Sequence, residues 1–376
     1  MNHNGVYLED ISETMYEALL SFELYGGITK VSRYGSGHIN DTFLVTVKDR
    51  IGKERRYIIQ KMNKSIFTQP EEVMENIMGV TSFLRKKVVA NGGDPERETL
   101  NVIPTKEGNK PYFVDSEGEY WRCYNFIVGA TTYDQVETVE DFYESAVAFG
   151  NFQRLLSDYP AETLHETIKG FHDTKARFEV FKKAIEADVC GRAAGIQKEI
   201  DFYLSREAVA NVFGDLLAKG EIPLRVTHND TKLNNVMIDE TTHKAICVID
   251  LDTVMPGLAM NDFGDSIRFG ASTAVEDEPD LSKVWCDMEL FKAYAKGFIK
   301  GCGGKLTEKE IELLPMGAKV MTYECGMRFL TDYLQGDTYF RIHREGQNLD
   351  RARTHMKLVW DMENKWDTMK EIIASI

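Results

Sequence analysis

A polar segment between two apolar stretches carries the residue types best suited to chemistry. His228, Asp230 and Asn235 follow the spacing His-x-Asp-x-x-x-x-Asn, and residues 224–227 and 236–238 on either side have the composition of short strands. Phosphoryl transfer to a hydroxyl group needs a carboxylate that accepts or orients the hydroxyl proton, and an oxygen ligand that holds a metal near the phosphates. The pattern predicts Asp230 as the catalytic base and Asn235 as a metal ligand.

A second carboxylate, Asp250, follows the apolar stretch 245–249, which is an expected buried strand. Magnesium is a hard cation that binds carboxylate and phosphate oxygens, so a carboxylate at the end of such a strand is a suitable ligand. A turn at residues 239–243 lets the loops of Asp230 and Asp250 converge. The catalytic loop of protein kinases has the same two roles at the same spacing.

The triplet Asp262-Phe263-Gly264 has the letters of the protein-kinase metal-binding motif. It lies too far beyond Asp230, no strand is expected before it, and the residues after it continue as a helix. Because a motif is only a hypothesis until its structural context agrees, we expect Asp262 to lie at a helix start and to support the catalytic loop. Asp252 could reach the metal, although we expect it to stay in solvent.

Residues 34–42 contain Gly35 and Gly37 before an expected strand, as in a glycine-rich loop whose backbone N–H groups cover phosphates. A phosphate-binding lysine is expected near Gln60-Lys61. Adjacent strand residues face opposite sides of a sheet, so only one of these two can face ATP. If Gln60 is that residue, Lys61 lies at the surface.

The apolar stretch 124–128 ends at a glycine and predicts the connection between two lobes, where Phe126 and Val128 would offer backbone groups to adenine. Glu75, on a helix that begins at Pro70, is either an ion-pair partner for the ATP site or part of a solvated face.

The elements around these residues predict an α+β, bilobal fold. Strand patterns dominate residues 27–128, interrupted by the helix from Pro70, which indicates a small nucleotide-binding lobe spanning residues 1–128. Helical patterns dominate the larger catalytic and substrate-binding lobe, residues 129–376. The expected helices there are 139–157, 176–187, 196–219, 281–300, 307–333 and 351–376, and the only expected strands are 224–227, 236–238 and 245–249.

Composition restricts the partners. The formal net charge of −15 disfavours nucleic acid and anionic membrane surfaces, which would repel the chain. No apolar run approaches the roughly 20 residues of a membrane helix, and residues 1–22 suggest an amphipathic helix. The six cysteines are scattered without metal-like spacing, so we expect a reduced, cytoplasmic protein, a monomer or weak dimer, with Cys247 in the core.

The sequence resembles the aminoglycoside phosphotransferase and choline kinase superfamily, and within it most closely the bacterial N-acetylhexosamine 1-kinases. The resemblance rests on residues 34–40, 227–235, 249–257, 262–273 and 324–334. It implies a protein-kinase-like fold and transfer of the ATP γ-phosphate to the C1 hydroxyl of N-acetylglucosamine or N-acetylgalactosamine. By motif position it implies Asp230 as base and Asn235 and Asp250 as Mg²⁺ ligands. The implied sugar pocket contains His38, Phe269, Arg328 and Tyr339.

Two other functions stay open. The chain could phosphorylate another small hydroxyl compound such as choline, an amino alcohol or an aminoglycoside. It could also be a non-catalytic nucleotide-binding regulator, although Asp230, Asn235 and Asp250 together disfavour that function. The sequence leaves open which of the two sugar epimers is preferred.

Overall fold

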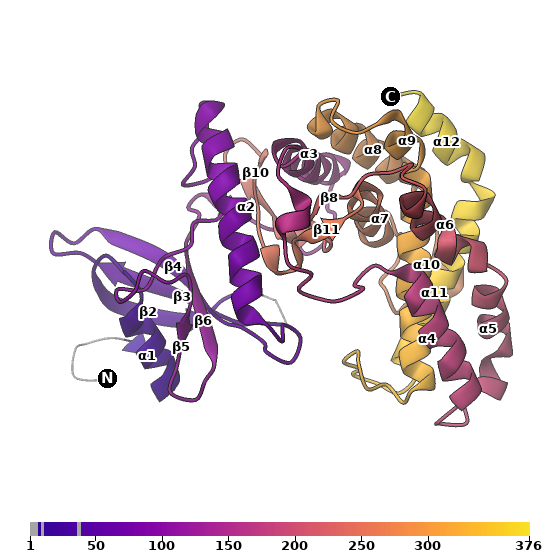
Figure 1. Cartoon of the computed structure of the whole chain (residues 1–376), viewed down its shortest axis with the longest axis horizontal. Helices are drawn as coiled ribbons and strands as arrows, with labels where there is room; N and C mark the ends of the chain where they lie inside the picture. Colours follow the sequence, from indigo (N-terminus) through magenta and orange to yellow (C-terminus); the bar gives the residue numbers. More distant parts are fainter. Residues whose placement is uncertain (1–6, 9–10, 36–38) are drawn as a thin grey trace.

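The computed structural model describes residues 7–8, 11–35 and 39–376. Figure 1 shows a sheet-containing lobe, formed by the N-terminal part of the chain, beside a larger helical lobe. The first lobe contains a six-stranded sheet of order β1-β2-β3-β4-β6-β5, in which only β1 and β2 are parallel. The strands are β1 (Tyr7–Leu8), β2 (Gly27–Arg33), β3 (Asp41–Lys48), β4 (Glu54–Lys61), β5 (Phe113–Val114) and β6 (Tyr120–Asn125).

The two faces of this sheet pack against different partners because side chains alternate along each strand. Tyr57 and Ile59 of β4 are buried on one face in a cluster with Met15 and Leu19 of helix α1 (Glu13–Ser21). Ile58 packs on the other face, against the core cluster of helix α2. Neighbouring residues of β4 therefore face opposite sides of the sheet. Gln60 lies on the same face as Ile58, and Lys61 lies on the same face as Ile59.

Helix α2 (Pro70–Ala90) joins the two lobes. Pro70 fixes the first turn, and Glu71 and Glu72 place negative charge at the positive end of the helix. Its apolar face packs with residues of both lobes in one core cluster. The buried Asn76 donates from Nδ2 to the carbonyl oxygens of His165, at 2.8 Å, and Val254, at 3.0 Å. The helix is thereby fixed to the helical lobe.

The C-terminal lobe is mainly helical. Its helices are α3 (Val139–Leu155), α4 (Thr174–Ala187), α5 (Gln197–Leu204), α6 (Glu207–Ala218), α7 (Ala259–Gly270), α8 (Met288–Cys302), α9 (Glu308–Glu312), α10 (Leu314–Leu334), α11 (Gln347–Asn364) and α12 (Trp366–Ala374). Helix α10 is buried along most of its length. It approaches α7 so closely that a Cβ atom at Gly264 would collide with the Gly317 carbonyl, so glycine is needed at this position.

Two small antiparallel sheets hold the loops of this lobe. One contains β7 (Ala130–Thr131), β9 (Val236–Asp239) and β10 (Ala245–Val248), and the other pairs β8 (Arg225–Thr227) with β11 (Met255–Gly257). The chain leaves the large sheet at Asn125 and enters a small one at Ala130. The predicted lobe boundary after Val128 falls in this connection, and the division into two domains stays a prediction.

The fold class predicted from the sequence is confirmed, and Cys247 is buried as expected. Several local predictions are wrong. Strands β7 and β11 were not expected, because two or three residues give no periodic signal. Residues 7–8 form a strand that pairs with β2, so the first helix begins only at Glu13. The expected helices 196–219, 281–300, 307–333 and 351–376 are each interrupted. No helix in the described part of the chain is long and apolar enough to cross a membrane.

Candidate active site

The loop that carries Asp230 runs from β8 to β9 and is held in place by hydrogen bonds to Asp262. The buried Asp262 carboxylate accepts hydrogen bonds from the backbone N–H groups of His228, at 2.9 Å, and Asn229, at 2.8 Å. Its carbonyl oxygen accepts a hydrogen bond from the Thr231 hydroxyl. Asp262 lies in the first turn of α7, so its predicted position and supporting contact are both confirmed, although β11, unexpectedly, precedes it.

His228 connects the two loops that carry the carboxylates. Its Nδ1 accepts a hydrogen bond from the Asp230 backbone N–H at 3.3 Å, so Nε2 carries the proton and donates to the Ile249 carbonyl oxygen at 2.8 Å. Ile249 immediately precedes Asp250. The buried imidazole ring therefore fixes the loop of Asp230 relative to the loop of Asp250.

The Asp230 carboxylate lies between a cation and an amide. Lys232 Nζ is 2.8 Å from Asp230 Oδ1, and Asn235 Nδ2 donates to Asp230 Oδ2 at 3.2 Å. Burial would lower the pKa of Lys232, but the charges of Asp230 and Asp265 outweigh it and raise that pKa above its ordinary value. Lys232 is a site residue that the sequence analysis did not single out, although its position two residues after Asp230 was visible.

Asp250 follows β10 in a left-handed conformation, with φ 59° and ψ 57°, and its side chain is solvent-accessible. The surrounding protein still limits its hydration. Together with the negative charges of Asp252 and Asp230, this reduced hydration raises the pKa of Asp250 to about 6. The predicted convergence of the Asp230 and Asp250 loops is therefore found.

These groups suit a hard divalent cation. Asn235 donates through Nδ2 to both the backbone and the side chain of Asp230, which leaves its amide oxygen as a ligand atom. The pKa of Asp250 is raised first by desolvation and then by the neighbouring negative charges, and a bound cation would stabilise the charged carboxylate against both effects. Carboxylate and amide oxygens are the ligand types that magnesium prefers.

Asp252 is neither solvated nor available to a metal. It is only 4% exposed, and Arg122 donates to both of its oxygens, with Arg122 Nη2 2.9 Å from Oδ2. Asn40 Nδ2 also donates to Oδ2 at 2.7 Å. The expectation that Asp252 stays in solvent is wrong because a buried cation from β6 compensates its charge.

Gln60 belongs to the same network. Its Oε1 accepts a hydrogen bond from Arg122 Nε at 2.9 Å, and its Nε2 donates to the Thr42 hydroxyl at 2.9 Å. Gln60 pairs with Arg122 across β4 and β6 and lies on the face turned toward the second lobe. A buried arginine on the adjacent strand therefore supplies the positive charge that is missing at position 60. The sequence analysis did not identify Arg122.

Lys61 lies on the opposite face of β4. It lines a cavity of about 450 Å³ with Met15 and Trp121, and its Nζ is 3.8 Å from Glu119. The sequence did not decide which of Gln60 and Lys61 faces ATP. Strand alternation turns Lys61 away from Asp252, as expected if Gln60 is the residue that faces ATP. Glu75 contacts His165 at 2.7 Å and is 67% exposed, so it is not a partner of the ATP site.

The remaining predicted nucleotide residues lie near the connection between lobes. Gly35 has φ 78° at the start of the glycine-rich segment, and Gly37 lies outside the described residues. The Phe126 ring packs edge-on against Tyr34 with a centroid distance of 5.7 Å. The Val128 carbonyl oxygen accepts a hydrogen bond from Arg97 Nη2 at 3.2 Å. Gly35, Phe126 and Val128 are thus brought to one region, and their roles stay predictions.

A buried histidine joins the catalytic loop to α10. His172 lies 2.9 Å from Glu324 through Nδ1 and donates from Nε2 to the Asn229 carbonyl oxygen at 3.2 Å. Burial alone would lower the pKa of His172, but the charge of Glu324 raises it above its usual value. Thr174 also donates to Glu324, at 2.6 Å. This region of α10 is therefore held next to Asp230.

Arg328 lies one turn beyond Glu324 on α10. Its guanidinium carbon is 5.7 Å from the ring centroid of Phe171 and 5.8 Å from that of Tyr339, and Nη2 is 3.5 Å from the Tyr339 hydroxyl. Phe269 is half-buried on α7, the helix packed against α10. Three of the four predicted pocket residues thus lie on adjoining elements. His38 lies outside the described residues.

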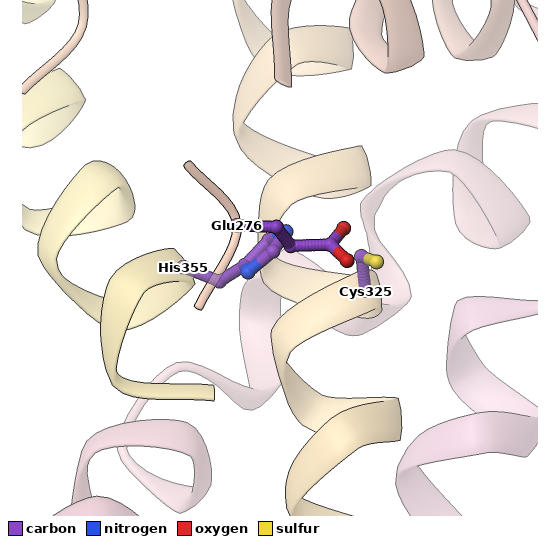
Figure 2. A group of neighbouring side chains, drawn as sticks. All are labelled: Glu276, Cys325 and His355. Atoms are coloured by element: carbon purple, nitrogen blue, oxygen red, sulfur yellow. The ribbon is translucent and has the colours of Figure 1, made fainter. Parts of the chain in front are cut away.

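A second group of potential metal ligands consists of Glu276, Cys325 and His355, drawn in Figure 2. Arg268 already supplies a cation there, because its Nη1 is 3.0 Å from Glu276 and 3.3 Å from His355 Nε2. Burial raises the pKa of Cys325 to about 11, which keeps the thiol protonated. These contacts disfavour a metal at this group.

Comparison with known proteins identifies the family to which the chain belongs. Residues 30–284 match the phosphotransferase enzyme family. The match spans more than half of the sequence, and the chain belongs to this family. It is therefore a phosphotransferase with a kinase-like fold.

Solved structures agree on the fold over nearly the whole chain. The aminoglycoside phosphotransferase of Alicyclobacillus acidocaldarius has a TM-score of 0.61 at 11% identity, covering 98% of both chains. An amicoumacin kinase solved with AMP-PNP and Ca²⁺ has a TM-score of 0.57 at 12% identity, covering 95% of this chain and 94% of that one. The choline kinase of Cryptosporidium parvum has a TM-score of 0.56 at 13% identity, covering 92% of each. At such identities the similarity concerns the fold alone.

Proposed function

We propose that this phosphotransferase is an ATP- and Mg²⁺-dependent sugar 1-kinase that acts on N-acetylglucosamine or N-acetylgalactosamine. The observation that carries the proposal is the arrangement of Asp230 beside Asn235 and Asp250, with α10 held against the same loop through His172. The N-acetylhexosamine assignment rests on the sequence resemblance. Arg328 and Tyr339 support it, because both side chains can bind hydroxyl and amide oxygens.

In this reaction Asp230 accepts the proton of the C1 hydroxyl as the hydroxyl oxygen attacks the γ-phosphorus. The bond from the γ-phosphorus to the bridging oxygen breaks, and ADP leaves. The anomeric hydroxyl is more acidic than an ordinary alcohol, so a carboxylate of modest basicity suffices. Lys232 Nζ, 2.8 Å from Asp230 Oδ1, orients the carboxylate. Asn235 and Asp250 would hold Mg²⁺, which supplies charge neutralisation for the phosphates.

On the nucleotide side, Gly35, Gly37, Gln60, Phe126 and Val128 would surround ATP. Gln60 is held by Arg122 and Thr42, so its amide is positioned rather than free to rotate. The neighbour solved with AMP-PNP and a divalent cation has the same fold and supports nucleotide and metal use here.

A coupled ADP-release assay over a panel of acceptors tests the proposal. The panel contains N-acetylglucosamine, N-acetylgalactosamine, glucose, choline, 1-amino-2-propanol and kanamycin, each with ATP and Mg²⁺. We expect turnover only with the two N-acetylhexosamines and close analogues. The ³¹P NMR spectrum of the product should show coupling between phosphorus and the proton on C1, as for a phosphate at that position. Turnover on choline or kanamycin alone would contradict the sugar assignment.

The second candidate is a kinase for an amino alcohol or an aminoglycoside, which the names of structural neighbours suggest. Such acceptors are cations, and a cationic acceptor would meet repulsion from Arg328. The same acceptor panel distinguishes the two candidates.

A further inference from the structure

A second arginine, Arg177, lies beside Arg328. Arg177 is in the first turns of α4 and its Nη2 contacts the Phe171 carbonyl oxygen at 3.5 Å, while the ring of the same Phe171 lies 5.7 Å from the Arg328 guanidinium. Phe171 therefore contacts two guanidinium groups from different helices, one through its carbonyl oxygen and one through its ring.

The two charges are close enough to repel each other. Burial and the positive charge of Arg328 together lower the pKa of Arg177 below its ordinary value. An arrangement that brings two like charges together costs free energy unless an opposite charge compensates it.

Within the described residues, neither arginine forms an ion pair with a carboxylate. The buried Nε of Arg177 has no hydrogen-bond partner. Arg328 contacts the Tyr339 hydroxyl and three aromatic rings, those of Phe171, Tyr339 and Phe340. Most other buried or half-buried arginines of the lobe, such as Arg206 and Arg225, are paired with glutamates. Unpaired N–H donors of this kind are suited to an oxyanion, which a guanidinium can bind through two oxygens.

The nearest carboxylates are already occupied. Glu324 accepts hydrogen bonds from Thr174 and from His172, and the second ring nitrogen of His172 faces the Asn229 carbonyl oxygen, so both ring nitrogens are donors and His172 and Glu324 form an ion pair. Asp173 caps α4 by accepting from the Ala176 backbone N–H at 2.9 Å. Two positive charges therefore remain that this part of the chain compensates only in part.

The arginine pair adjoins the catalytic loop. Phe171 contacts His172 with ring centroids 4.4 Å apart, and His172 donates to the carbonyl oxygen of Asn229, the residue before Asp230. An acceptor whose hydroxyl group lies at Asp230 can thus extend toward Arg177 and Arg328, with the Phe171 and Tyr339 rings as apolar walls.

We propose that Arg177 and Arg328 form a binding site for an oxyanion on the acceptor, so that the preferred substrate is an acidic sugar bearing a carboxylate, phosphate or sulfate group. This inference rests on the proposed sugar kinase function and narrows it. The neutral N-acetylhexosamines are then poorer substrates than their acidic derivatives, because only the latter offset the repulsion between the two arginines.

Matched pairs of sugars test the inference, each consisting of a neutral and an acidic member. Suitable pairs combine N-acetylglucosamine with its 6-sulfate, its 6-phosphate or its 3-O-lactyl ether. We expect kcat/KM to be at least tenfold higher for the acidic member of one pair, and the advantage to shrink between 50 and 500 mM KCl, since salt screens such charges. The substituent that gives the advantage identifies the oxyanion and its position.

Arg177→Gln should lower kcat/KM for the acidic sugar at least tenfold more than for the neutral one, and Arg177→Lys should restore only part of the difference. Lys175→Gln is the matched control, because it removes an exposed charge from the same helix. Equal kcat/KM values within every pair, or equal losses in Arg177→Gln for both members, would overturn the inference.

Calorimetry of sugar binding to the full-length protein with AMP-PNP and Mg²⁺ separates this inference from the proposed function. Tighter binding of an acidic sugar without any phosphorylation at C1 would contradict the kinase assignment while supporting the oxyanion site. C1 phosphorylation with no preference for acidic sugars would support the kinase assignment and overturn the oxyanion site.

Discussion

The guanidinium of Arg122 donates hydrogen bonds to both carboxylate oxygens of Asp252, a residue 130 positions later in the chain. Both side chains are almost completely buried. This pair connects β6 of the N-terminal sheet to the segment that directly follows Asp250. Through Gln60 and Asn40 it also reaches β4 and the end of the glycine-rich segment. The proposed ATP site thus contains a buried arginine that does not come from the expected strand.

The first prediction concerns this pair. Asp252→Ala should lower the free energy of unfolding by about 3–5 kcal/mol, because it leaves the Arg122 charge buried and uncompensated. Urea denaturation followed by circular dichroism measures the change. The double variant Arg122→Met with Asp252→Ala should lose less than the sum of the two single variants. Additive losses would show that the two side chains are not coupled.

Glu312→Ala, which removes a surface pair with Lys309, is the control for this prediction and should have no measurable effect on the free energy of unfolding.

The second prediction concerns the base. Asp230→Asn keeps the size of the side chain and its contact with Lys232 but removes the proton acceptor. We expect kcat to fall by at least ~10², with ATP affinity nearly intact, as for loss of a general base. Steady-state kinetics and nucleotide titration measure the two quantities. Asp367→Asn, at an exposed position of α12, is the matched control. Full activity in Asp230→Asn would remove this residue from the mechanism.

The third prediction separates the metal ligand from the loop support. Asp250→Ala should abolish Mg²⁺-dependent turnover with little change in stability, because its side chain is solvent-accessible. Asp262→Ala should lower the free energy of unfolding by about 3 kcal/mol or more, because two buried backbone N–H groups and Gln153 lose their acceptor. Turnover assays and thermal denaturation of both variants test this. The reverse pattern would make Asp262 the metal ligand.

The fourth prediction concerns acid stability. His355 is buried, donates from Nδ1 to the Arg351 carbonyl oxygen and accepts from Arg268 at Nε2, so it is neutral. Burial lowers its pKa to about 4. An unfolded histidine has a pKa of about 6.5. As the pH falls from about 6.5 to about 4, the unfolded state binds a proton that the folded state does not.

Stability contributed by neutral His355 is therefore lost over this range, by about 3 kcal/mol. Melting temperatures measured between pH 7 and pH 4 should fall less steeply in His355→Gln than in the wild type. His343→Gln, at an exposed position, should keep the wild-type slope. Identical slopes in His355→Gln and the wild type would contradict the low pKa.

Local sequence signals predicted much of the fold correctly. The strands around Val45 and Ile59 and the helix from Pro70 were found because their alternating or helical apolar patterns extend over many residues. The interruptions in the later helices were missed because the apolar pattern continues across them. Strand β11 was missed because its three residues form a strand only through pairing with β8.

From the sequence alone, a catalytic and metal-binding role of the loop could be proposed. Asp230, Asn235 and Asp250 could be proposed from residue type, spacing and flanking strands, because contacts between near neighbours in sequence create this part of the site. Only the tertiary structure decided which side of β4 faces the second lobe, that Arg122 compensates Asp252, and that Arg177 lies beside Arg328. Each of these depends on side chains far apart in the chain, whose meeting is fixed by the packing of α2, α4 and α10 and leaves no trace in local periodicity.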